Sequence, residues 1–252
     1  LQSRLLNGSN TSIVSDVLNR IEETNPSISK LISIIREAMT SDIGNIPVTL
    51  INRPSPDFME GAAAYYDVND RTVVLFNDVT FRGKNGKADA TILHEIVHAF
   101  TYSTLRLNPT KRAEAEKLFE AVKAELVNKY GKTAEDLMKE YPLYFYGLTN
   151  VDEFFSELFA NPRFSKELAK LGPTGLVNVD KSNNILLKLL DWILSIFNIN
   201  RSNNAYVEGM NMLYDVMLTY SKEPEGLGNI PIPPMFMPSI AASARTNDAT
   251  KI

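Results

Sequence analysis

Two histidines four residues apart have the clearest chemical potential in this sequence. His94 and His98 are the only histidines among 252 residues, and Glu95 lies between them in the segment DATILHEIVHAF. On a helix, this spacing places both imidazoles on one face, one turn apart. A zinc ion takes such nitrogen ligands at ~2.0–2.1 Å. Glu95 would lie beside the metal, where its carboxylate can take a proton from a water without being a ligand.

The neighbours of these histidines indicate a buried helix over residues 88–105. Six apolar residues flank the motif, namely Ile92, Leu93, Ile96, Val97, Ala99 and Phe100. Two histidines and a glutamate inside such a helix are costly unless each finds a partner. The alternative is a pair of core histidines that bind no metal. Because two histidines placed at random fall four apart only roughly one time in a hundred, the sequence favours a metal site.

A catalytic zinc ion also needs a third protein ligand and an open position for a water. The chain has no third histidine and no cysteine, so the third ligand must be a carboxylate. The segment VDEFFSELFA is predicted to form a helix over 151–160, with Glu153 and Glu157 four residues apart among phenylalanines. Carboxylates on so apolar a helix are costly unless they meet a metal, a histidine or an arginine. The alternative for Glu153 is a purely structural capping box with Asn150.

The two motifs together resemble a known family of zinc peptidases. HEIVH followed by YGLTNVDEFFSELF is similar to the gluzincin peptidases related to the catalytic domain of anthrax lethal factor. The resemblance implies one zinc ion per chain, bound by His94, His98 and Glu153. It also implies that the phenol of Tyr146 stabilises an oxyanion, and that Glu157 orients a metal ligand without binding the metal.

Two further features bear on this resemblance. Tyr141 and Tyr144 lie close to Tyr146 in the sequence and are alternative donors to the oxyanion. The segment DEFFSELFANPRF also resembles peptidase-like domains of large polyvalent phage proteins. Because the chain begins at Leu1 rather than Met, we expect it to be a processed product or a piece of a longer polypeptide.

The remaining pattern predicts an α+β fold, and the resemblance implies that this fold is of the zincin-like metallopeptidase type. We expect a single peptidase domain over 1–220 and a Pro-rich extended tail over 221–252. The domain would consist of N-terminal helices (1–45), the sheet and the histidine helix (46–107), and a helical part with the third ligand (108–220). Besides the two helices above, periodicity and turn residues predict helices over 11–24, 27–39 and 110–130, and Gly131 ends the last of them. The same signals predict strands over 46–52, 61–67 and 72–77.

The predicted hairpin has a functional interpretation. By the resemblance, strand 61–67 is the edge of the sheet over the cleft, and an extended substrate can add to it through backbone hydrogen bonds. The small residues 61–64 would leave room for the side chains of that substrate. The alternative is an ordinary hairpin whose tyrosines face the core.

Composition excludes several kinds of partner and site. A net charge of -4 offers no basic surface to nucleic acid or to an anionic membrane, and no apolar run is long enough to span a bilayer. The lack of cysteine excludes disulfides and thiolate metal sites. It fits a cytoplasmic or virion-associated protein and is also compatible with a secreted one. The apolar segment 185–199 is interpreted as a core helix or, alternatively, an interface helix, and it and the tail 221–252 are candidate contacts for a protein partner.

These features predict a zinc-dependent endopeptidase that acts on a peptide or protein substrate. Glu95 would activate a zinc-bound water and then protonate the leaving amine. The alternatives are a catalytically inactive zinc-binding virion or scaffold protein and a protease that processes its own polypeptide. A structural zinc site has a closed fourth position, whereas a catalytic one keeps an exchangeable water.

Overall fold

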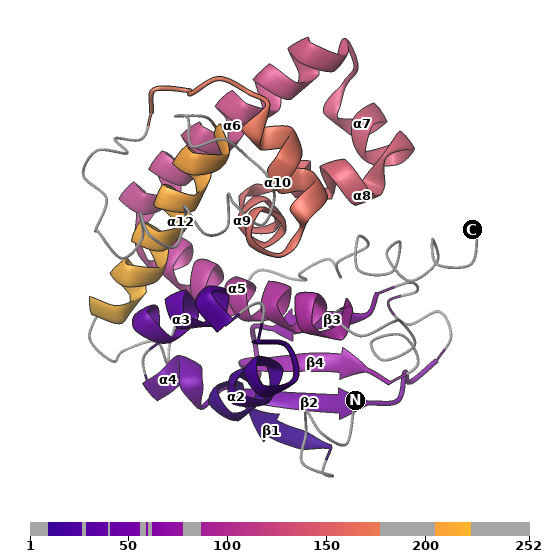
Figure 1. Ribbon diagram of the computed structural model, residues 1–252, viewed down its shortest axis with the longest axis vertical. Coiled ribbons are helices and arrows are strands. Elements are labelled where there is room, and N and C mark those ends of the chain that lie inside the picture. Colours follow the sequence, from indigo (N-terminus) through magenta and orange to yellow (C-terminus); the bar gives the residue numbers. More distant parts are fainter. Residues whose placement is uncertain are drawn as a thin grey trace.

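The computed structural model describes residues 10–26, 29–39, 41–55, 59, 62–77, 87–176 and 205–222. They form a structure of the α+β class, in which a small sheet lies on one side of a long helix and a group of helices lies on the other (Figure 1). The predicted helix 185–199 and the predicted tail after Lys222 lie outside the described residues. None of the described helices is both long and apolar enough to cross a membrane.

Four strands form the sheet, in the order β1-β2-β4-β3. They are β1 (Thr11–Ile13), β2 (Pro47–Ile51), β3 (Ala64–Asp67) and β4 (Thr72–Phe76). β2 and β4 are parallel, and each outer strand is antiparallel to its neighbour. Four of the five residues of β4 are buried, which is typical of an inner strand that is covered on its faces.

The predicted hairpin is confirmed as β3 and β4, with Ala64 opposite Leu75. β3 begins at Ala64, three residues later than predicted. Before this strand, the carbonyls of Met59 and Ala62 accept hydrogen bonds from the guanidinium of Arg53. Among the described strands β3 lies at the edge of the sheet, as the resemblance implied, and it packs against the histidine helix.

The first N-terminal helix begins later than predicted. Residues 11–13 were predicted as the first turn of a helix, but they form β1, in which Ile13 pairs with Pro47. This pairing covers an edge of β2 that would otherwise expose its backbone groups. The apolar stripe from Val14 to Ile21 remains buried on the shortened helix. The helices of this region are α2 (Val14–Thr24), α3 (Ser29–Ala38) and α4 (Ser41–Gly44).

The long helix α5 (Lys87–Leu107) carries both histidines between the sheet and the helical part (Figure 1). It contacts β3 and β4 on one side and α9 (Val151–Ala160) and α12 (Ala205–Lys222) on the other. α6 ends as predicted at Gly131, whose φ of 62° is the left-handed conformation of a helix C-cap. The remaining elements are α6 (Pro109–Tyr130), α7 (Ala134–Glu140), α8 (Pro142–Phe145), α10 (Pro162–Ala169) and the 3-10 helix η2 (Tyr146–Leu148).

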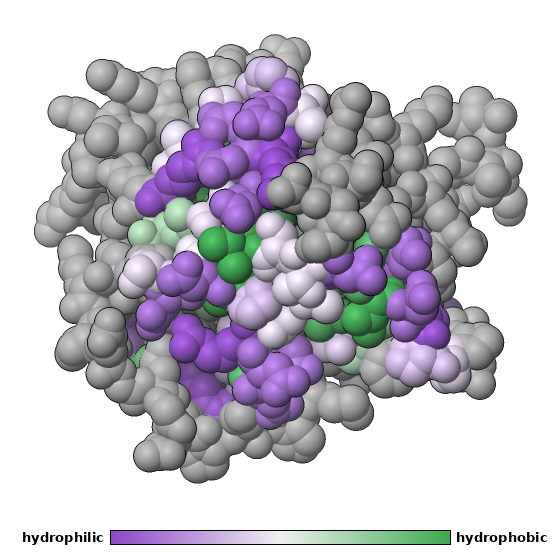
Figure 2. Space-filling model, turned by 90° about the horizontal axis from the view of Figure 1, so that it is seen from below, coloured by the Kyte–Doolittle hydropathy of each residue, from purple (hydrophilic) through white to green (hydrophobic). Residues whose placement is uncertain are grey.

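One hydrophobic core joins the sheet, α5 and the helical part. α12 continues to Lys222, beyond residue 220 where the predicted domain ends. It approaches α9 closely at Gly209, where a Cβ would lie only 2.9 Å from Leu158 Cδ2. On the side where β1, α2 and α4 lie, most of the described surface is hydrophilic (Figure 2).

Candidate metal centre

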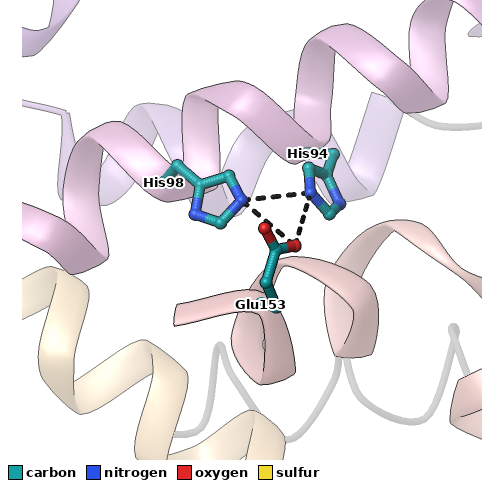
Figure 3. Close-up of side chains that lie close together, drawn as sticks. All are labelled: His94, His98 and Glu153. Carbon is teal, nitrogen blue, oxygen red and sulfur yellow. Dashed lines mark hydrogen bonds and ion pairs between the residues drawn. The ribbon is translucent and has the colours of Figure 1, made fainter. Parts of the chain in front are cut away.

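Helices α5 and α9 bring the predicted metal ligands together. His94 and His98 project from successive turns of α5, and Glu153 projects toward both from the first turn of α9 (Figure 3). All three side chains are buried, with at most 2% of each residue exposed. The two Nε2 atoms are 3.1 Å apart, and Glu153 Oε2 lies 3.2 Å from Nε2 of His94 and 3.4 Å from Nε2 of His98.

The spacing of these three atoms fits a metal ion. A tetrahedral zinc ion with bonds of ~2.0–2.1 Å places its ligand atoms ~3.3–3.4 Å from one another. The separations of 3.1, 3.2 and 3.4 Å in this cluster are close to that spacing. Glu153 Oε2 is buried and its contacts within the described residues are with the Nε2 atoms of the two histidines, so its charge is balanced only by a protonated ring or by a metal ion. His94, His98 and Glu153 can therefore hold a metal ion.

The start of α9 decides between the two interpretations of Glu153. The Oδ1 of Asn150 caps the helix by accepting hydrogen bonds from two backbone N–H groups, one of them that of Glu153. In a capping box, the Glu153 carboxylate would turn back to the N–H of Asn150. It turns instead to His94 and His98. The capping residue was correctly identified, but the structural interpretation of the Glu153 side chain is wrong.

Glu157, one turn further along α9, contacts the other nitrogen of a histidine ring. Its Oε1 lies 3.3 Å from His94 Nδ1, and the side chain is fully buried. A carboxylate that accepts the Nδ1–H proton leaves the lone pair of the ring on Nε2, the atom that faces the cluster. Glu157 thus lies beside a candidate ligand and outside the triangle of donor atoms.

Glu95 is buried next to the cluster, with 2% of the residue exposed. Its Oε1 has no hydrogen-bond partner within the described residues, while the backbone N–H of Tyr66 on β3 donates to its carboxylate. Burial raises the pKa of Glu95, and the charges of His94 and His98 and the Tyr66 N–H act in the opposite direction. A buried carboxylate with a raised pKa beside a metal site is suited to taking up a proton.

Of the three candidate tyrosines, Tyr146 is the one that reaches the cluster. Its hydroxyl donates to Glu153 Oε1 at 3.4 Å, and the residue is only 5% exposed. Tyr141 and Tyr144 are 48% and 38% exposed, and their rings pack against Phe145. The structure therefore brings Tyr146, rather than either neighbour, into contact with a candidate metal ligand.

The charges of the cluster depend strongly on one another. Burial opposes a charge on His94, but its contacts with the carboxylates of Glu153 and Glu157 outweigh burial and raise the pKa of His94 to about 10. Burial also opposes a charge on Glu153, but the charge of His98 and the contacts with both imidazoles lower the pKa of Glu153 to about 2. Without a metal, His94 and Glu153 are an imidazolium and a carboxylate, so a metal ion must displace a proton from His94.

Two groups of the site were missed from the sequence. One is the Tyr66 N–H, which reaches Glu95 only because β3 lies along α5. The other is Asn161, whose Nδ2 donates to Glu157 Oε2. An asparagine directly before Pro162 is a readable signal for the start of a helix. Nothing in the local sequence indicates that its amide would also reach Glu157.

No family model, curated protein or solved structure matches this chain. The similarity of its motifs to gluzincin peptidases and to phage peptidase-like domains therefore stays a prediction, as does the compartment in which the protein acts. The interpretation of the site depends on its own geometry and chemistry.

Proposed function

We propose that this protein is a zinc-dependent endopeptidase of the gluzincin type, with a zincin-like fold and one zinc ion per chain. The observation that carries the proposal is the convergence of His94, His98 and Glu153, with Glu95 buried beside them. Three protein ligands of this kind are typical of catalytic zinc, whereas a structural site is closed by a fourth. Among the described residues the cluster contains three groups that can bind the metal, and this number favours an enzyme over an inactive zinc-binding scaffold.

In this proposal, each residue around the bound metal has its own role. Zinc would supply a Lewis acid that polarises a carbonyl and lowers the pKa of a bound water to ~7. Glu95 would take the proton of the attacking water and deliver it to the leaving amine. Tyr146, whose hydroxyl lies 3.4 Å from Glu153 Oε1, would donate to the oxyanion of the tetrahedral intermediate. Glu157 would keep His94 in the tautomer whose Nε2 is free to bind.

The register of β3 supports its predicted role in holding an extended peptide. The N–H of Phe76 donates to the carbonyl of Ala63, so the backbone groups of Ala63 point toward β4. Because this orientation alternates in an antiparallel ladder, the N–H and C=O groups of Ala64 and Tyr66 point away from β4. The Tyr66 N–H contacts Glu95. A peptide that pairs with Ala64 would therefore pass beside the proposed general base.

The direct test of this function is the Glu95→Gln variant. It should keep the fold and the zinc content while losing roughly 10²–10⁴-fold in the rate of cleavage of a peptide library, because it removes the base and no ligand. Glu120→Gln, an exposed glutamate of α6, is the matched control and should cleave at the parent rate. A Glu95→Gln protein as active as the parent would contradict the proposal.

The metal is tested separately from the chemistry. Elemental analysis of protein purified without chelators should give about one zinc per chain, the stoichiometry of a mononuclear site. Glu153→Ala removes a ligand and should lower that content sharply, whereas Glu120→Ala should not. Protein that is folded and contains no zinc would rule out the assignment.

A further inference from the structure

Asn161 lies at the junction of two helices of the site. It ends α9, where its backbone N–H donates to the carbonyl of Glu157, and it is the N-cap of α10. The residue is 3% exposed. Its Oδ1 accepts hydrogen bonds from the backbone N–H groups of Arg163, at 3.0 Å, and Phe164, at 3.4 Å. Because a backbone N–H can bond only to the oxygen of the amide, these two contacts fix its orientation.

The fixed orientation directs the two N–H bonds of Nδ2 toward two acceptors. Nδ2 donates to Glu157 Oε2 and, at 2.8 Å, to the backbone carbonyl of Leu143. With Oδ1 and Nδ2 each making two contacts, the hydrogen-bonding capacity of the amide is filled. Glu157 Oε2 is held from this side, while its Oε1 lies 3.3 Å from His94 Nδ1. A continuous chain of polar contacts therefore runs from Leu143 through Asn161 and Glu157 to His94.

We propose that Asn161 is a positioning residue of the metal centre, which acts on His94 through Glu157. By holding one carboxylate oxygen, it aims the other at Nδ1 and so fixes the tautomer and the direction of the metal-binding Nε2. Its contact with Leu143 also ties α9 to the segment that leads into Tyr146. The inference rests on the proposed metal site, but the contacts between Asn161, Glu157 and His94 do not need a metal.

The rival explanation is that Asn161 only caps α10. Two substitutions separate the roles, because Asn161→Ser keeps an oxygen that can cap the helix while Asn161→Ala does not. Alanine has no donor, and the single O–H of serine cannot serve both Glu157 and Leu143 as the two N–H bonds of the amide do. A positioning role therefore predicts that both variants lose zinc affinity alike, about 10–100-fold, the usual cost of removing a partner of a ligand. A capping role predicts parent affinity for Asn161→Ser.

The experiment measures zinc affinity by competition with a chromophoric chelator. Asn108→Ser is the matched control, since Asn108 caps α6 by accepting a hydrogen bond from the Lys111 N–H and has no described contact with the cluster. It should bind zinc as the parent does. In a Glu157→Ala background, Asn161→Ser should cause little further loss, because the residue through which it acts has gone. An additional tenfold loss in that background would overturn the proposal.

A second readout uses the metal-free protein, so that it remains decisive if the parent binds no zinc. With only two histidines in the chain, nitrogen-15 labelling of histidine gives a spectrum of two rings. The Nδ1–H proton of His94 should be protected from exchange in the parent and in Asn108→Ser, and should broaden or disappear in Asn161→Ser. An unchanged His94 signal in folded Asn161→Ser would overturn the proposal. If the parent binds no zinc while Asn161→Ser loses the His94 signal as expected, the result would count against the metal site and not against the positioning role of Asn161.

Discussion

Zinc affinity should rise steeply with pH, because the cluster holds a proton that the metal must displace. The contacts of His94 with Glu153 and Glu157 outweigh its burial and raise its pKa to about 10. A raised pKa means that the metal-free protein keeps this proton as the pH increases, until about pH 10. Each pH unit below that value therefore costs zinc a factor of about ten, or ~1.4 kcal/mol. Between about pH 7 and 9, the affinity should therefore increase ~100-fold.

The assay is competition with a chelator whose own proton affinities are known, repeated at several pH values in one buffer system. An imidazole with an ordinary pKa of ~6.5 would be mostly neutral above about pH 7.5, and zinc affinity would then be level. A level profile between about pH 7.5 and 9 would refute the assigned charges of the cluster. In Glu157→Gln, which removes one carboxylate that raises the pKa of His94, the profile should become level at lower pH. The exposed control Glu120→Gln should follow the parent.

Two further predictions concern the segment around η2. Gly147→Ala would place a Cβ 2.6 Å from Phe164 Cε1, and this overpacking should lower the free energy of unfolding by about 1–3 kcal/mol in denaturant titrations. Gly172→Ala, which meets nothing within 4 Å, should unfold as the parent does, and equal stability of the two variants would contradict the packing. Tyr146→Phe should reduce turnover roughly 10²–10³-fold with little change in zinc content. The exposed Tyr141→Phe is its control, and a loss of turnover in that variant alone would reverse the assignment.

The positions of the candidate ligands were predictable because helical spacing is local. His94 and His98 lie one turn apart on any helix, and VDEFFSELFA has too many apolar residues for Glu153 and Glu157 to avoid the interior. Asn150 was likewise readable as the start of α9, because its short side chain can accept the first N–H groups of a helix. These features depend on residues within two or three turns of one another.

The missed features depend on contacts between distant segments. Residues 11–13 continue a helical pattern, and only the exposed edge of β2 turns them into a strand. Tyr146 was named through the resemblance, but its contact with Glu153 becomes visible only in the path of α8 and η2. The Tyr66 N–H is a backbone group, for which side-chain identity gives no signal, and it reaches Glu95 through the packing of β3 on α5.

The most direct test of the account is a crystal structure of the purified protein with anomalous data collected on both sides of the zinc absorption edge. The account predicts a single strong zinc peak bound by Nε2 of His94, Nε2 of His98 and the carboxylate of Glu153, with a water or a solvent molecule in the remaining position. Glu95 should lie beside that molecule without binding the metal. A cluster without zinc, or a zinc ion closed by a fourth protein ligand, would contradict the claim that this is a catalytic metal centre.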